Sequence, residues 1–320
     1  MPARKRRNVF RRKRRRARRG GGFALFSILI ILLVGAVLAY WQRDEILTRL
    51  GFGTARFEWL NEQHIAVGEL TVTFIDVGQG DAAFIRHSEG TTMLIDAGDH
   101  RRNSGQRIYS YLQSIGVTHI DYIVGTHPHA DHIGGIEHLL RNISVGRIFM
   151  PYIQHNTQTF LNLLIAIDEL EHRVETPAPG DRLNIGGAEA TFIHPRVPQD
   201  ASLNDHSLML IVRFGEHSFI FTGDAEHPAE GMLVDKGINI SATVLDVGHH
   251  GSTTSTGEAF LAAVNPQIAV IQVGANSFGH PHPSVLNRLL ANVEQVYRTD
   301  LYGTIVFTTD GEELRVTTER

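Results

Sequence analysis

Cysteine is absent from the 320 residues of this chain, and this absence limits the sites that the sequence can build. Disulfide bonds are excluded, and any zinc site has to be made from histidine and carboxylate ligands. A chain without cysteine fits an exported protein and a cytosolic protein equally well, because it has no thiol that either compartment would oxidise or reduce.

Basic residues are scarce beyond the first 20 residues. That segment holds 12 of the 30 Lys and Arg residues and no Asp or Glu, so the rest of the chain has 18 basic and 34 acidic residues, a balance of −16. Broad nonspecific affinity for nucleic acid depends on many Lys and Arg contacts to phosphates, and the acidic body argues against it. A phosphodiester held by metal ions is not excluded.

Charge is also missing from residues 23–41, an apolar stretch that follows the basic run. Its length is close to the ~20 residues that an apolar helix needs to cross a bilayer. We expect a basic cytoplasmic tail (1–22), a transmembrane helix (23–41), a juxtamembrane linker (42–68) and a folded domain (69–320). Arginine-rich flanks stay on the cytoplasmic side, which predicts a single-pass protein of the cell membrane whose domain is extracytoplasmic.

Two other interpretations of the N-terminus stay open. Val37-Leu38-Ala39 resembles the small-residue cleavage site of a signal peptide. However, the apolar stretch is longer than the ~7–15 residues of a signal-peptide core. The arginine run is also typical of a nuclear-localisation or nucleic-acid-binding arm, but the adjoining apolar stretch favours a membrane anchor.

The folded domain contains two successive series of strands and helices. The first series runs from Leu70 to about residue 171, and the second from Ser207 to Phe307. Two such halves favour the α/β class, with two sheets packed face to face and helices on the outside. The expected architecture is therefore an αββα sandwich.

Side chains that bind metals are concentrated in the run His127-Pro128-His129-Ala130-Asp131-His132, directly after the apolar strand pattern 122–124. Loops at strand ends are where rigid scaffolds place functional groups. Imidazole and carboxylate suit zinc, iron or manganese, and a curved loop can direct His127 and His129 at one ion and Asp131 and His132 at another. A histidine-rich surface loop is the alternative, but the strand–loop–helix context favours a two-metal site.

This run resembles the His-x-His-x-Asp-His signature of the metallo-β-lactamase superfamily. Six further blocks resemble its ComEC-like branch, the hydrolase domain of competence DNA-uptake proteins. In chain order they are Phe74-Ile75-Asp76-Val77-Gly78-Gln79-Gly80-Asp81-Ala82, Leu94-Ile95-Asp96-Ala97-Gly98, Asn204-Asp205-His206-Ser207-Leu208, Phe221-Thr222-Gly223-Asp224, Gly248-His249-His250-Gly251-Ser252 and Gly279-His280-Pro281-His282-Pro283. So many ordered blocks are more specific than one motif. The resemblance implies the metallo-β-lactamase fold and two divalent metal ions, Zn²⁺ first and Mn²⁺ as the alternative.

Carried over by position, the resemblance implies that Asp224 bridges the two metal ions, although an aspartate after a strand is also typical of a helix N-cap. It implies that His250 is the last ligand and that His249 lines the pocket, and these two roles stay interchangeable. His206 would complete the first site or be a solvent-facing histidine at a strand entry. In the second case water or substrate would fill the remaining positions of the first metal.

Three aspartates at strand ends, Asp76, Asp81 and Asp96, are expected to support these ligands. Metal-bound histidine usually donates its other ring N–H to a carboxylate or a carbonyl, and Asp96 is the foremost candidate for that role. Turn formation is the alternative for all three.

The expected catalytic residues are Asp131, Asp224, His249 and His280. The two aspartates would orient the attacking water in a metal-assisted hydrolysis. His280, in the last of the blocks, would donate to a phosphate oxygen or protonate the leaving group, and His249 would steady the transferred group. His282 is expected to be structural.

The resemblance implies a nuclease or phosphodiesterase, with single-stranded DNA as one substrate. One membrane span cannot form the multi-span channel of the competence proteins, so a smaller extracytoplasmic phosphodiester from a cell-wall polymer or lipid headgroup is a second possibility. Another ester, a thioester or a lactam also stays open, because a fold does not fix a function. A non-catalytic, metal-stabilised binding module is a further alternative, and the complete set of ligands argues against it.

Protease treatment of intact cells tests the predicted topology. We expect the domain to be degraded while a cytoplasmic marker protein stays intact, because the arginine run keeps the N-terminus inside. A domain that becomes sensitive only after the cells are lysed would contradict the outward orientation.

Overall fold

The structure is a computed structural model that describes residues 65–320. The predicted basic tail, the transmembrane helix at 23–41 and nearly all of the linker lie outside the described residues. Within residues 65–320, no helix has the length and the apolar character that a membrane span requires. The described residues belong to one compact unit, Trp59–Arg320.

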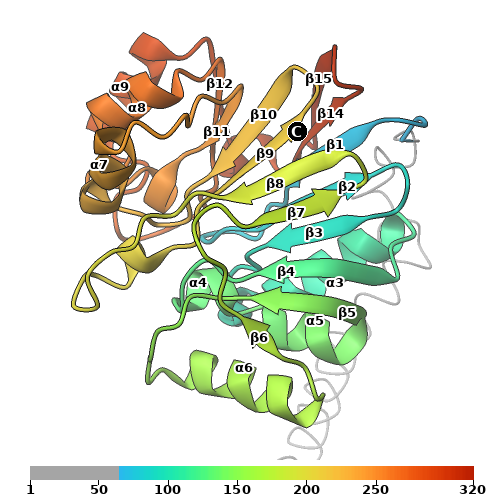
Figure 1. The fold of residues 1–320 in the computed structure, drawn as a ribbon. Helices are drawn as coiled ribbons and strands as arrows, with labels where there is room; N and C mark the ends of the chain where they lie inside the picture. The colour runs from blue at the N-terminus through green and yellow to red at the C-terminus, as the bar shows by residue number, and fades with distance from the viewer. Residues whose placement is uncertain (1–64) are drawn as a thin grey trace, which may run out of the picture. The chain divides into compact units, whose positions relative to one another are not determined.

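Two β-sheets form the centre of this unit (Figure 1). In the described residues the first sheet has eight strands in the order β15-β14-β1-β2-β3-β4-β5-β6, and the second has seven in the order β13-β12-β11-β10-β9-β8-β7. The strands are β1 (Leu70–Phe74), β2 (Ala83–His87), β3 (Thr92–Ile95), β4 (His119–Val124), β5 (Ser144–Phe149), β6 (Val174–Glu175), β7 (Arg182–Ile185), β8 (Ala188–Phe192), β9 (Leu210–Phe214), β10 (His217–Phe221), β11 (Val244–Asp246), β12 (Ile268–Ile271), β13 (Gln295–Arg298), β14 (Ile305–Thr309) and β15 (Leu314–Thr318).

Helices cover the outer faces of the two sheets, with α3, α5 and α6 on the first and α7, α8 and α9 on the second (Figure 1). The helices are α3 (Ser104–Ser114), α4 (Ala130–Ile133), α5 (Ile136–Asn142), α6 (Gln158–Glu169), α7 (His227–Asp235), α8 (Glu258–Val264), α9 (Pro283–Asn292) and α10 (Thr299–Tyr302). Short 3₁₀ turns are η2 (His100–Arg102), η3 (Asn204–His206) and η4 (Gly248–Gly251). The expected αββα architecture is confirmed.

The central strands β9 to β12 of the second sheet carry apolar residues on both faces because each face packs against a layer. In β10, Phe219 and Phe221 belong to the core between the sheets, whereas Ile220 belongs to the core under the helices. This period of two follows from the pleat of a strand. Across the sheets, the Phe74 ring lies 5.9 Å from the Phe221 ring, and the Phe307 ring lies 5.9 Å from the Phe219 ring. These aromatic contacts hold the two sheets face to face.

Parallel pairing determines where the functional loops lie. Strand β3 runs parallel to β4, and β10, β11 and β12 run parallel to one another. The carboxyl ends of parallel neighbours meet at the same edge of a sheet, where open α/β sheets place their ligands. The loops that follow these five strands therefore form the site.

Candidate metal centre

Most of the expected site residues come from five loops at the carboxyl ends of parallel strands. In chain order these loops carry Asp96 after β3, the run 127–132 after β4, Asp224 after β10, the pair His249 and His250 after β11, and His280 after β12. Residues that are more than 180 positions apart in the sequence thus meet at one edge of the two sheets.

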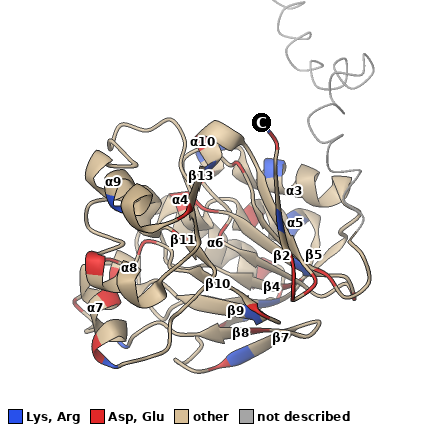
Figure 2. Ribbon diagram, turned by 90° about the horizontal axis from the view of Figure 1, so that it is seen from above, with Lys and Arg blue, Asp and Glu red and all other residues tan. Residues whose placement is uncertain are grey.

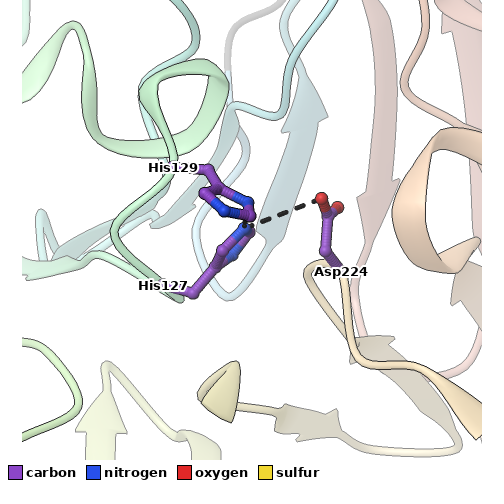
Figure 3. A group of neighbouring side chains, drawn as sticks. All are labelled: His127, His129 and Asp224. Atoms are coloured by element: carbon purple, nitrogen blue, oxygen red, sulfur yellow. Dashed lines mark hydrogen bonds and ion pairs between the residues drawn. The ribbon is translucent and has the colours of Figure 1, made fainter. Parts of the chain in front are cut away.

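A first group of ligand atoms consists of His127, His129 and Asp224, whose donor atoms lie within 4.8 Å of one another. His127 Nε2 is 3.0 Å from His129 Nδ1 and 3.6 Å from Asp224 Oδ2. Figure 3 shows both rings and the carboxylate pointing into the same space. This group could hold one metal ion.

A second group consists of Asp131, His132 and His250. His250 Nε2 is 3.3 Å from Asp131 Oδ2, and the rings of His132 and His250 are 5.3 Å apart. The His132 and His250 side chains are 0 % and 2 % exposed, whereas that of Asp131 is 27 % exposed. Only Asp131 of this group is open to an entering substrate.

Asp224 lies between the two groups. Its Oδ2 atom faces His127, while its Oδ1 atom is 3.1 Å from His132 Nε2 and 3.7 Å from His250 Nε2. One carboxylate therefore presents one oxygen to each group, which is the arrangement of a ligand shared by two metal ions.

The chemistry of these atoms fits divalent metal ions. His132 Nε2, His250 Nε2 and Asp224 Oδ1 are all buried without a hydrogen-bond partner. A buried polar atom without a partner costs about 1–3 kcal/mol. Because the three atoms converge, one cation would satisfy all of them, and a set of nitrogen and carboxylate donors suits zinc or manganese.

The outer nitrogens of the two histidine rings in the second group are both engaged. His132 Nδ1 is 2.7 Å from Asp96 Oδ2, and His250 Nδ1 is 2.9 Å from the Gln272 carbonyl oxygen and 3.1 Å from Asp81 Oδ1. A ring that donates from Nδ1 presents the lone pair of Nε2 to a metal. The expected supporting roles of Asp81 and Asp96 agree with these contacts.

Asp96 also holds the loop that carries the histidine run. Its Oδ1 accepts from the Thr126 N–H at 2.8 Å, and its Oδ2 accepts from the Thr126 hydroxyl at 2.6 Å. The Gly-Gly pair after the run allows the start of α5 to pack against the Asp96 loop, since a Cβ on Gly135 would lie 2.2 Å from the Ala97 carbonyl oxygen. Only glycine lets the start of α5 approach the Asp96 loop so closely.

The pKa values of the site differ between the two groups of ligand atoms. Burial lowers the pKa of His132, but the carboxylates of Asp224 and Asp96 outweigh it and raise that pKa well above its usual value. Burial raises the pKa of Asp224, but the charges of His132 and His250 bring it well below its usual value. Burial lowers the pKa of His127 well below its usual value, so this ring is neutral and its lone pair is free for a metal.

The adjacent His249 and His250 point different ways because both have left-handed backbones, with φ of 51° and 54°. Such backbones are uncommon for residues with a side chain, and strain of this kind gathers at functional sites. His250 lies in the second group, whereas His249 is 22 % exposed with Nε2 3.6 Å from Asp224 Oδ2. The geometry favours His250 as the ligand and His249 as the residue that lines the pocket.

His280 lies next to His249 on the open side. Their ring centroids are 5.4 Å apart, and His280 Nδ1 is buried without a hydrogen-bond partner. Burial and the neighbouring charges of His249 and His250 lower the pKa of His280. His282 caps α9 by accepting from the Ser284 N–H, which agrees with the expected structural role.

His206 belongs to none of the groups of ligand atoms found among residues 65–320. Its neighbour Ser207 faces the site, with Oγ 3.4 Å from His127 Nδ1. His206 lies with His194 on the wall of a separate cavity of about 620 Å³. That His206 completes the first site therefore stays a prediction.

Asp76 forms a turn, which was the alternative to its expected supporting role. Its Oδ1 accepts from the Gly78 N–H at 3.0 Å, and its Oδ2 is 2.7 Å from Arg320 Nη2. These contacts stabilise the loop after β1 and the C-terminus rather than a ligand ring.

The sequence interpretation missed Asp246 and Gln272, which lie behind His250. Asp246 Oδ2 accepts from Gln272 Nε2 at 3.0 Å, and Gln272 Oε1 accepts from the Ala82 N–H at 2.8 Å. Burial raises the pKa of Asp246 well above its usual value. The sequence signal that could have identified Asp246 was its position at the end of an apolar strand.

Replacing Asp96 with asparagine tests its supporting role. We expect the D96N variant to fold but to bind zinc about 10–100-fold more weakly, because His132 loses its carboxylate partner. Isothermal titration calorimetry measures the affinity. The matched control is D121N, because Asp121 accepts from the Thr92 N–H and hydroxyl just as Asp96 does from Thr126. Equal zinc affinities of D96N and D121N would contradict the supporting role of Asp96.

Comparison with known proteins identifies the family of this chain. Residues 75–274 match the metallo-beta-lactamase superfamily. ComE operon protein 3 of Bacillus subtilis (strain 168) is 35 % identical over 253 residues, 74 % of this chain and 32 % of that protein. Competence protein ComA of Neisseria gonorrhoeae is 31 % identical over 283 residues, 88 % of this chain and 37 % of that protein.

The chain spans about a third of the length of these two relatives. Among solved structures, the metallo-beta-lactamase fold protein YhfI from Bacillus subtilis is similar in fold, with a TM-score of 0.52 and 14 % identity over 75 % of this chain and 100 % of that chain. The chain therefore belongs to the metallo-beta-lactamase superfamily.

Proposed function

We propose that this chain is a membrane-anchored two-metal hydrolase that cleaves phosphodiester bonds outside the cytoplasm. The observation that carries the proposal is the position of Asp224, whose two oxygens face two separate groups of ligand atoms. Zn²⁺ is the proposed metal, with Mn²⁺ as the alternative, since both accept imidazole and carboxylate ligands. The anchor rests on the apolar stretch 23–41, which lies outside the described residues.

In this proposal His127, His129 and Asp224 hold the first ion, and Asp131, His132, Asp224 and His250 hold the second. When bound, the two ions would supply Lewis acidity and lower the pKa of the water that attacks the substrate. Asp131 orients that water, because its side chain is the accessible carboxylate of the second group. The fully buried rings of His127 and His132 exclude bulk water from the floor of the site.

His249 and His280 act on the substrate from the open side of the site. His249 is fixed by its Nδ1 contacts, 3.2 Å to Thr254 Oγ1 and 3.6 Å to Glu226 Oε1, so its Nε2 faces the space next to Asp224. A ring nitrogen in that position can donate to a phosphate oxygen. His280 lies beside it and can protonate the leaving group.

The relative named Competence protein ComA supports a phosphodiester, with single-stranded DNA as one substrate. Smaller phosphodiesters, other esters, thioesters and lactams are the alternatives, because one fold hosts many reactions. A non-catalytic binding module would need neither an exposed Asp131 nor two histidines on the open side of the metal groups. The hydrolase is therefore the better explanation of this geometry.

Replacing Asp131 with alanine tests the proposed reaction. We expect the D131A variant of the full chain to lose at least about 100-fold of its turnover of bis-p-nitrophenyl phosphate with Zn²⁺ or Mn²⁺, because the attacking water is no longer oriented. Its melting temperature should stay within a few degrees of the wild type, since Asp131 is partly exposed.

The control variant is D310N, which changes an exposed aspartate in the turn between β14 and β15. Its turnover should equal that of the wild type. A D131A variant that keeps full turnover of every substrate the wild type cleaves would refute the site.

A further inference from the structure

Exposed aromatic side chains are rare in the described domain; one of them lies on a loop of the metal centre, and another lies on a neighbouring loop. Tyr152 is 87 % exposed on the loop between β5 and α6, and Phe278 is 70 % exposed on the loop between β12 and α9. Among residues 65–320, Tyr302 is the one other large aromatic residue that is exposed, and its exposed fraction is 36 %. Surface aromatics at a site are typical of ligand contacts.

The Phe278 loop is held in place by one side chain. Asn276 Oδ1 accepts from the backbone N–H groups of Phe278, Gly279 and His280 at 3.0–3.1 Å. The Phe278 ring lies 5.8 Å from the His280 ring at an interplanar angle of 32°. His280 in turn contacts His249. A fixed loop thus presents an exposed ring next to the proposed general acid.

The loop that carries Tyr152 contacts the first group of ligand atoms. His155 of this loop lies with its ring 6.0 Å from that of His129. Beside it is a cavity of about 490 Å³ whose largely apolar walls include Pro151, Tyr152, His155, Phe160 and Leu164. A cavity of this size and character can hold a flat organic ring.

The charges of the domain do not provide an alternative way to bind a long polyanion. Lys and Arg positions, blue in Figure 2, are scattered over the ribbon. Several of the arginines are bound to carboxylates, such as Arg101 to Asp99 and Arg147 to Glu175. Stacking of bases on aromatic rings does not depend on basic residues, and every base offers a flat face.

We infer that the Phe278 ring and the Tyr152 cavity bind the nucleobases that flank the scissile phosphodiester, so that the substrate is single-stranded nucleic acid. The inference rests on the proposed phosphodiesterase function. A single strand is the matching form, because the bases of a duplex are stacked on one another and are not free to contact protein rings. In this arrangement the metal centre would bind the phosphate, and the two loops would bind the bases.

The inference can be tested with two phosphodiesters that differ only in the base. The first is the p-nitrophenyl ester of thymidine 5′-phosphate, and the second is the same ester with hydrogen in place of thymine. We expect the full wild-type chain, loaded with Zn²⁺ or Mn²⁺, to cleave the thymidine ester with a kcat/KM about 10-fold higher.

The variants F278A and Y152A separate stacking from catalysis. For the thymidine ester we expect at least one of them to raise KM about 10-fold with little change in kcat, and for the abasic ester neither should change KM. F278W should restore the KM that F278A loses, because tryptophan supplies another flat face. The matched control is L290A, which removes a side chain that is 61 % exposed on α9.

Failure of the inference and failure of the proposed function give different results. Equal kcat/KM for the two esters, unchanged in F278A and Y152A, would overturn base stacking and leave the phosphodiesterase intact. Such a result would favour a base-free substrate such as a lipid headgroup or a cell-wall polymer. A folded, metal-loaded wild-type chain that cleaves neither ester would overturn the proposed function, and the inference with it.

Discussion

The approach of the Asp224 carboxylate to His127 and His132 is the contact on which the rest of the site depends. Asp224 follows a strand of the second sheet, and both histidines follow a strand of the first. The contact forms because the two sheets pack with their carboxyl edges together. Phe221, three residues before Asp224, packs on Phe74 across the interface, so the core that stabilises the fold also fixes the distance between the ligands.

Burial of so many carboxylates requires positive charge nearby. Asp81, Asp96, Asp224 and Asp246 are all less than 5 % exposed and lie around one cluster of rings. Isolated buried charges are costly, and paired ones are tolerated only with good geometry. Divalent ions in this cluster would balance the carboxylates, so metal binding and stability of the domain are expected to be coupled.

The sequence predicts the parts of this site that are local and misses those that depend on packing. The run 127–132 can be assigned because its four donors and the strand before them are contiguous, whereas Asp224 and His250 required the resemblance to a family. The role of His206 could not be decided from the sequence, because the 3₁₀ turn η3, rather than a regular strand, decides that Ser207 faces His127. Asp246 was missed because its role arises from pairing of β11 with β12.

The αββα layers were predictable from apolar periodicity, but two-residue strands such as β6 were not, since pairing rather than composition defines them.

The metal content of the purified chain tests the central claim most directly. After loading with Zn²⁺ or Mn²⁺ and removal of free metal, mass spectrometry of the metals should find two ions for each wild-type chain. The D224A variant, which loses the carboxylate between the two groups, should retain one ion or none while keeping the wild-type circular dichroism spectrum. A wild-type chain that retains no more than one ion, or a D224A variant that still retains two with unchanged affinity, would contradict a shared two-metal site.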